Sequence, residues 1–147
     1  MYKVLIFYYS RTGNTEKMAK AIEDGMKTPQ EARVELKYHI KPEELENFDA
    51  IIIGAPTYHH DMTSDMKNIF EEAAVKNVNL KGKVGAAFGS YGWSGEAPRM
   101  VLEIMKNKFE MDILTPPLLI RYAPDQTGLR KCREFGEKII EKLTQKD

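Results

Sequence analysis

The sequence predicts an α/β fold: a doubly wound, five-stranded parallel sheet with strand order 2-1-3-4-5 and helices on both faces. Three observations predict it. Strand-like apolar runs alternate with helical patterns along the 147 residues. The first, third and fourth runs are almost wholly apolar, as expected of parallel strands that are covered on both faces. The second and fifth runs have features of edge strands, which places them at the two ends of the order.

Five runs have the composition of β-strands. In the second, Val34 and Leu36 alternate with charged residues such as Glu35, so one face of this strand meets water. The fifth contains Pro116 and Pro117, which lack N–H donors and are tolerated at a sheet edge. In chain order the predicted strands are Tyr2–Tyr9, Arg33–His39, Ala50–Gly54, Val84–Gly89 and Asp112–Tyr122.

Helical patterns lie between and after these strands, with apolar residues recurring three and four positions apart. Their apolar positions are Met18, Ala19, Ile22 and Met26; Met66, Ile69, Phe70 and Ala73; Ala97, Val101, Ile104 and Met105; and Leu129, Cys132, Gly136, Ile139, Ile140 and Leu143. Right-handed crossovers place the ligand crevice of such a fold at the carboxyl ends of the strands. The sequence therefore predicts that the site is built from three loops, Ser10–Thr15, Ala55–Asp61 and Ser90–Glu96.

Composition limits the function classes. The chain is 42% hydrophobic and 30% charged, and its 22 basic and 22 acidic residues give a net charge of zero, so neither nucleic acid nor an anionic membrane is an expected partner. Its one cysteine, Cys132, excludes an intramolecular disulfide and a multi-cysteine metal site, and is expected to be buried in the last helix. No secretory signal or membrane span is recognisable. We expect one cytoplasmic domain over residues 1–147.

The first loop favours an anion. Hydroxyl and amide side chains surround a glycine that allows a tight turn, and the next helix directs the positive end of its dipole into the same space. The alternative is ordinary helix capping, which needs only one such residue. A phosphate-binding GxxxxGK[ST] motif is missing, so nucleoside triphosphate hydrolysis is not favoured. The loop has the sequence Ser10-Arg11-Thr12-Gly13-Asn14-Thr15. For Arg11 the alternative to anion binding is that its side chain simply points into solvent.

The other two loops carry aromatic residues. Tyr91 and Trp93 lie among glycines in the third loop, where a planar ligand could stack on them, and their alternative role is to pack on neighbouring helices. Tyr58 in the second loop offers another wall. The adjacent His59 and His60 form a weak metal site because neighbouring side chains diverge, so no metal is expected. A phosphate loop with two aromatic walls fits flavin mononucleotide (FMN) better than a dinucleotide, which favours GxGxxG.

On these motifs the chain resembles the flavodoxin family over essentially its whole length. SRTGNTEKMA matches the family's phosphate loop, GSYGWSGEA is similar to the flavin-ring loop of short-chain clostridial-type flavodoxins, and GAPTYHHDM is similar to the flavodoxin domain of flavodiiron proteins. The resemblance implies that loop 10–15 wraps the FMN phosphate and that Trp93 and Tyr58 flank the ring. The implied FMN-binding residues are Ser10, Arg11, Thr12, Gly13, Asn14, Thr15, Pro56, Thr57, Tyr58, His59, His60, Ser90, Tyr91, Gly92, Trp93 and Gly95.

Two departures from the family refine this expectation. His59 stands where many flavodoxins have a glycine whose peptide flips toward the reduced ring, so we predict a less stabilised one-electron-reduced FMN. The net charge of zero differs from the strongly acidic character of flavodoxins and weakens steering toward a basic partner.

The resemblance implies a monomeric electron carrier that shuttles one or two electrons between transiently bound redox partner proteins, with no catalytic residue. Two alternatives stay open: an FMN-dependent NAD(P)H:quinone reductase, and a dedicated partner of one redox enzyme. A response regulator would need acidic residues where Ser10-Arg11 and Gly54-Ala55 stand, and a low-molecular-weight phosphatase would need a cysteine in the first loop.

Overall fold

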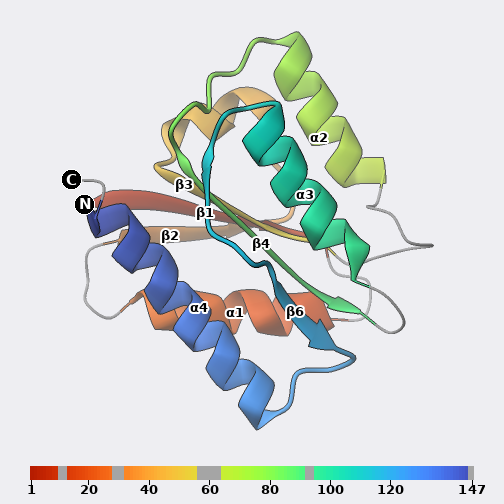
Figure 1. Ribbon diagram of the computed structural model, residues 1–147, viewed down its shortest axis with the longest axis vertical. Coiled ribbons are helices and arrows are strands. Elements are labelled where there is room, and N and C mark those ends of the chain that lie inside the picture. Colours follow the sequence, from red (N-terminus) through yellow and green to blue (C-terminus); the bar gives the residue numbers. More distant parts are fainter. Residues whose placement is uncertain (10–12, 28–31, 56–63, 92–94, 146–147) are drawn as a thin grey trace.

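The predicted strand order is confirmed. The computed structural model describes residues 1–9, 13–27, 32–55, 64–91 and 95–145. Its sheet has the order β2-β1-β3-β4-β5, with β6 also paired to β4, and every pairing is parallel (Figure 1). The strands are β1 (Tyr2–Tyr8), β2 (Ala32–Lys37), β3 (Ala50–Gly54), β4 (Val84–Tyr91), β5 (Asp112–Ile113) and β6 (Leu118–Arg121).

The fifth position of the sheet differs from the prediction in one respect. The expected strand Asp112–Tyr122 forms two short strands, of which β5 pairs with the beginning of β4 and β6 with its end. Pro116 and Pro117 lie between them. A proline cannot donate a hydrogen bond to the ladder, so the pairing stops at this pair and resumes beyond it.

Helices cover both faces of the sheet, as predicted. Helices α1 (Asn14–Met26) and α4 (Gln126–Gln145) lie on one face, and α2 (Ser64–Val75), α3 (Glu96–Asn107) and the 3-10 helix η1 (Pro42–Asn47) lie on the other (Figure 1). Alternate residues of β1 divide between the two cores, Val4 and Ile6 toward the first and Leu5 and Phe7 toward the second. This division follows from the period of two in a strand.

Helices α1 and α4 approach each other at backbone distance. A Cβ atom added at Gly136 would meet the carbonyl oxygen of Ile22, and one added at Gly25 would meet the carbonyl oxygen of Arg133. Each helix therefore presents a glycine where the other's backbone passes. Cys132, which is fully buried in this layer, has the packing role expected of it, and burial raises the pKa of its thiol to about 11.

The segment of the chain that connects β2 to β3 covers little of the sheet, because its helix η1 is only 6 residues long. Leu45 of η1 is buried. The Lys83 ammonium group holds the end of this segment, because it donates hydrogen bonds to the backbone carbonyls of Glu46 at 3.0 Å and Phe48 at 2.6 Å. These charge-assisted bonds hold η1 against the amino edge of the sheet.

Candidate functional site

The candidate site lies at the carboxyl edge of the sheet, where β1, β3 and β4 end side by side. Tyr8 pairs with Gly54, and Gly54 with Phe88. The backbone bonds continue one residue further: Tyr9 donates to the carbonyl of Gly54 at 3.1 Å, and Ala55 donates to that of Phe88 at 2.9 Å. Tyr9 and Ala55, from which the first two predicted loops leave the sheet, are therefore held in fixed positions relative to each other.

Part of the predicted site lies outside the described residues, and the other part can be placed. Ser10, Arg11, Thr12, Pro56, Thr57, Tyr58, His59, His60, Gly92 and Trp93 are not described, and the predictions for them remain predictions. The described members are Gly13, Asn14, Thr15, Ser90, Tyr91 and Gly95. They lie at the beginning of α1, at the end of β4 and at the beginning of α3.

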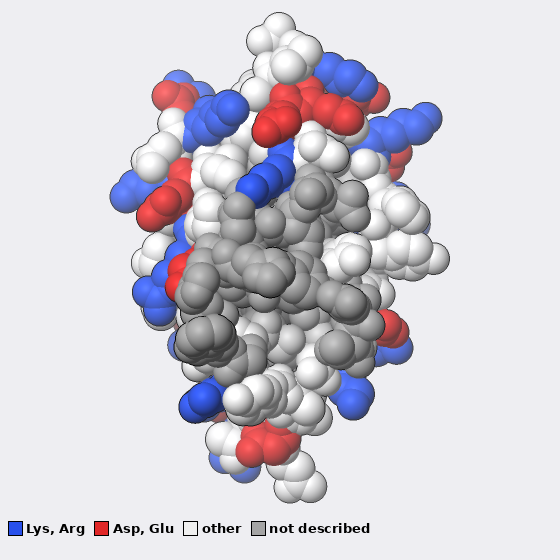
Figure 2. Space-filling view, turned by 90° about the vertical axis from the view of Figure 1, so that its right-hand side faces the viewer, with Lys and Arg blue, Asp and Glu red and all other residues white. Residues whose placement is uncertain are grey.

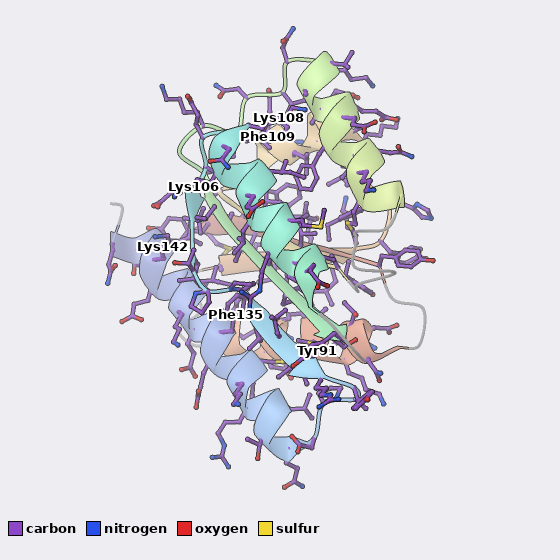
Figure 3. All side chains as sticks on the ribbon, turned by 45° about the vertical axis from the view of Figure 1, so that its right-hand side comes forward. Tyr91, Lys106, Lys108, Phe109, Phe135 and Lys142 are labelled. Carbon is purple, nitrogen blue, oxygen red and sulfur yellow. The ribbon has the colours of Figure 1, made fainter. Side chains whose placement is uncertain are left out.

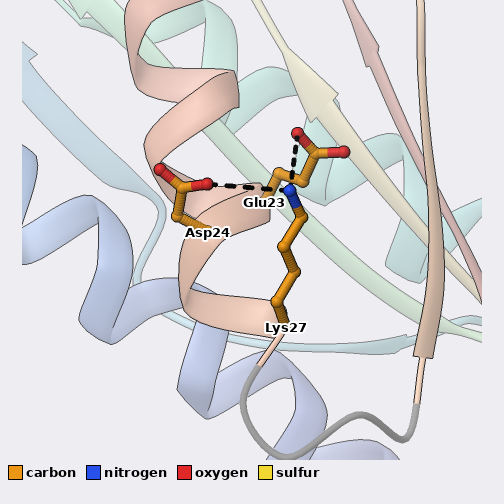
Figure 4. A network of polar contacts seen from close by, with 3 residues as sticks. All are labelled: Glu23, Asp24 and Lys27. Atoms are coloured by element: carbon orange, nitrogen blue, oxygen red, sulfur yellow. Dashed lines mark ion pairs between the residues drawn. The ribbon is translucent and has the colours of Figure 1, made fainter.

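The two ends of α1 are built differently. At its carboxyl end, Lys27 Nζ lies 4.0 Å from Glu23 Oε1 and 3.9 Å from Asp24 Oδ1 (Figure 4). At its amino end Gly13 is the N-cap residue, which has no side chain that could form a capping hydrogen bond. The amide groups of the first turn and the positive end of the helix dipole lie at this end of α1, where the sequence predicts the phosphate loop.

Gly13 makes the turn into α1 possible. Its φ of 87° lies in the left-handed region, which costs a residue with a Cβ about 1–2 kcal/mol. A Cβ built on Gly13 would have no atom within 4 Å, so the constraint comes from the backbone angle and not from lack of space. The sequence-based interpretation of this glycine as the turn residue of the loop is therefore consistent with its conformation.

Thr15 joins the first loop to the third. It is 2% exposed, the one buried polar residue found among the described part of the chain, and its Oγ1 lies 3.4 Å from Ser90 Oγ. This distance is long for a hydrogen bond between hydroxyl groups. It nevertheless shows that two residues 75 positions apart in the sequence place their hydroxyl groups together. Two loops predicted separately from the sequence thus share one polar surface.

Strand β4 extends further than predicted, so that Ser90 and Tyr91 are its last residues and not part of a loop. At Gly89, a Cβ would meet the carbonyl oxygen of Ala55, so the absence of a side chain lets β3 and β4 stay close as they enter the site. Gly95, at the N-cap of α3, also has no side-chain capping bond. The strand places Ser90 and Tyr91 rigidly at the edge.

One neighbour of the site was not predicted. Tyr122 follows β6, and its N–H donates to the Tyr91 carbonyl at 2.6 Å. It has a φ of 59° and is 59% exposed, with the Arg121 guanidinium 5.1 Å from its ring centre. The sequence indicated Tyr122 only as the end of a strand, because nothing in a single sequence signals a left-handed tyrosine.

The charge around the carboxyl edge is mixed. Figure 2 views this edge and shows acidic and basic side chains interspersed around its rim. Figure 3 places Tyr91 well away from Lys106 and Lys108, which lie around the carboxyl end of α3. Those lysines are therefore far from the site, and the described residues at its centre are neutral.

The donor set of the described residues fits a phosphate. It consists of a left-handed glycine, the amide groups at the amino end of α1 and two hydroxyl groups that meet at the same place. Among the residues that the structure describes, no three His, Cys, Asp or Glu side chains form a group that could hold a metal ion, and the predictions for His59 and His60 lie outside the described residues. His39, the described histidine, is exposed beyond β2.

Comparison with known proteins agrees with this arrangement. The sequence model of the flavodoxin family matches residues 6–136. A flavodoxin of Clostridium beijerinckii is 32% identical and is covered over 96% of its length by 91% of this chain. A solved flavodoxin from the domain Archaea is 37% identical, with a TM-score of 0.86 over 97% of this chain and 99% of that one.

Longer proteins contain the same kind of domain. The type A flavoprotein of Rhodobacter capsulatus is 37% identical over 96% of this chain, which spans only 33% of that relative. The chain thus corresponds to about a third of the first curated relatives, and to nearly all of the shorter ones. The family match, the strand order and the built carboxyl edge lead to one conclusion: the chain belongs to the flavodoxin family, whose members bind FMN and transfer electrons.

Proposed function

We propose that this chain is a single domain that carries one or two electrons on FMN between redox partner proteins. The observation that supports it most directly is the junction of Gly13, Thr15 and Ser90, which provides phosphate-compatible donors at the carboxyl edge expected to hold the cofactor. When bound, FMN supplies the redox chemistry, and the protein supplies binding, orientation and exclusion of water.

Each described residue has a proposed part in binding. The first turn of α1 donates its amide groups to the phosphate, and Gly13 gives the turn that directs them. The end of β4 presents backbone groups of Ser90 and Tyr91 to the edge of the ring. From the family pattern, Tyr58 and Trp93 are proposed to flank the ring.

We further propose a monomer that meets its partners transiently in the cytoplasm. The single cysteine is buried, which suits a reducing compartment, and no helix in the described part of the chain has the length and apolar character needed to span a membrane. The even balance of charges suits brief encounters with partners of either sign.

The decisive experiment is an absorption spectrum of the purified protein, followed by identification of the released cofactor and stepwise anaerobic reduction. Flavin bands, FMN on release and no oxidation of NAD(P)H by the protein alone are the expected results. Steady NAD(P)H turnover with a quinone would instead establish the reductase alternative. A protein that cannot be reconstituted with FMN would refute both.

A second measurement separates a general carrier from a dedicated partner. Reduced protein is mixed with unrelated electron acceptors, and the rates of flavin reoxidation are compared. Similar rates with several acceptors are expected of a carrier, whereas reoxidation by one protein alone would contradict the proposal.

A further inference from the structure

A cavity lies beside the predicted cofactor site. It has a volume of about 520 Å³ and opens beyond the ends of β1 and β2, between α1 and α2. None of the described residues that are predicted to bind FMN lines it. Its size is that of a small-molecule site, for which volumes of roughly 300–1,000 Å³ are typical. The cavity is thus large enough to hold a ligand of its own.

The floor of the cavity is apolar. Phe7 of β1 and Met66 and Ile69 of α2 line it, and they are 5%, 0% and 8% exposed. These side chains belong to the same core cluster, so the floor is the rigid surface of the packed sheet layer. A flat apolar body placed on it would be removed from water on one side, which is the main source of affinity in small-molecule sites.

Aromatic side chains form its wall. Tyr8 and Tyr9 come from the end of β1, and Tyr38 and His39 follow β2. The rings of Tyr38 and His39 lie 5.1 Å apart at an interplanar angle of 56°. Tyr38 is 69% exposed, so part of its ring is available for a planar ligand to stack on.

The charged groups that line the cavity are carboxylates. Glu16 of α1 and Glu72 of α2 are in the lining, and no lysine or arginine is among the described residues there. Lys20 lies 3.0 Å from Glu16 and partly compensates its charge. Glu72 is exposed and has Lys76 nearby, but the close partner of Lys76 is Glu43 at 2.7 Å, which leaves Glu72 as the stronger attraction for a cation. Burial, and then the Glu16 carboxylate, raise the pKa of Tyr8, so its hydroxyl group stays neutral.

We propose that this cavity binds a small planar organic cation of the N-alkylpyridinium type, with its ring against Tyr38 and the apolar floor and its charge toward Glu72. The carboxylates disfavour an anion. A neutral ring of the same shape would gain the stacking and the burial but not the attraction of the carboxylate or the cation–π contact. The inference needs no bound FMN and does not depend on the proposed function.

The test compares two probes that differ in charge. Binding of 1-methylnicotinamide, a pyridinium cation, and of nicotinamide, its neutral parent, is measured by amide NMR shifts in the flavin-free and the FMN-loaded protein. We expect saturable shifts at Tyr38 and Ile69 in both forms, and binding of the cation about fivefold tighter, which corresponds to about 1 kcal/mol. Equal affinity for the two probes, or no saturable shift at these residues, would overturn the proposal.

Variants locate the attraction. Glu72→Gln is expected to weaken binding of the cation about three- to fivefold and to leave nicotinamide unchanged. Glu71→Gln removes the same charge from the next position of α2, which does not line the cavity, and should have little effect. Equal losses from both variants would mean that only the general charge of the surface acts, and would contradict a defined site.

The role of the ring is tested separately. Tyr38→Ala is expected to weaken both probes, because stacking is lost, and Tyr38→Phe should retain most of the affinity. Because Tyr38 is exposed, neither change should disturb folding. Unchanged binding by Tyr38→Ala would place the ligand elsewhere and refute the arrangement.

Discussion

The helices on the two faces of the sheet pack with different closeness. On one face α1 and α4 pack so closely that glycine is needed at both positions of contact, Gly25 and Gly136. On the other, the part of the sheet beside β2 is covered by the short η1 and by α2, and a cavity of about 520 Å³ remains at the carboxyl edge. The same sheet thus has one face packed to exclude space and one that leaves room.

This difference teaches how the fold separates stability from binding. The α1–α4 layer fixes the amino end of α1, and with it Asn14 and Thr15. The opposite layer can be hollow because the floor of its cavity, Met66 and Phe7, is already packed in the core. Substitutions at the close contact of α1 and α4 should therefore cost the most stability, whereas those of residues that line the cavity should act mainly on binding.

The largest effect is expected from Gly136→Ala. The added methyl group would overlap the Ile22 carbonyl of α1, and a backbone atom cannot turn aside as a side chain can. Overpacking of a core costs about 1–3 kcal/mol or more, and we expect about 3 kcal/mol of unfolding free energy to be lost in urea titrations.

Gly128→Ala on the same helix is the matched control. There the added Cβ would lie at ordinary contact distances, 3.4 Å from Asp125 Oδ1 and 3.5 Å from Ile120 Cδ1. Since alanine favours a helix by about 1 kcal/mol over glycine, this variant should be as stable as the original or slightly more so. Similar losses from both variants would show that the close approach of α1 and α4 is not what requires Gly136.

A smaller effect is expected on the thinly covered face, from Lys83→Met. The change removes both bonds to the carbonyls of Glu46 and Phe48 and should cost about 1–2 kcal/mol, with faster amide exchange in η1. Lys81→Met is the control, because Lys81 makes only a long, exposed ion pair of 3.8 Å with Glu110. If the amide hydrogens of η1 exchanged at an unchanged rate in Lys83→Met, the Lys83 ammonium group would not be what holds η1 in place.

The same contrast marks what could be predicted from the sequence. Apolar periodicity gave the strand order, and the Pro116-Pro117 pair indicated an edge, but its effect of dividing the strand depends on how the ladder resumes beyond it. Gly136 was predicted only as part of an apolar stripe, since the partner backbone that requires it is more than a hundred residues away in the sequence. A contact between residues far apart in the sequence cannot be recognised from a local sequence pattern.

For the site, the residues at the beginning of α1 could be predicted because turn chemistry is local: a glycine among hydroxyl side chains before a helix has few interpretations. The predicted strand order placed the loops of Thr15 and Ser90 at the same edge, but the contact between their hydroxyl groups was not predicted. The cavity beside β2 could not be predicted. It depends on Tyr38, Glu72 and Met66, which share no motif and are brought together only by the packing of α2.

At the edge where the two layers meet, Gly13→Ala tests the turn. A φ of 87° is unfavourable for alanine, so the unfolding free energy should fall by about 1–2 kcal/mol and the affinity for FMN should fall with it. Gly13→Asn is the matched variant, because asparagine tolerates the left-handed region better and should recover part of both losses. Calorimetric titration of FMN and urea unfolding measure the two quantities. Equal behaviour of Ala and Asn would point to a cause other than the backbone angle.

The smallest effect concerns the surface contact between η1 and α2. Lys76 Nζ donates to Glu43 Oε1 at 2.7 Å, and this hydrogen bond lowers the pKa of Glu43 and raises that of Lys76. A carboxyl group with a lowered pKa stabilises the fold above its ordinary pKa, and that contribution is lost as the pH falls through the lowered value. Both side chains are exposed, so Lys76→Met should leave the urea midpoint almost unchanged while an NMR titration finds the pKa of Glu43 returned toward its ordinary value. A clear loss of stability at neutral pH in this variant would mean that the contact between η1 and α2 depends on surface charges. The packed floor of the cavity would then not be sufficient to explain why this face of the sheet is stable.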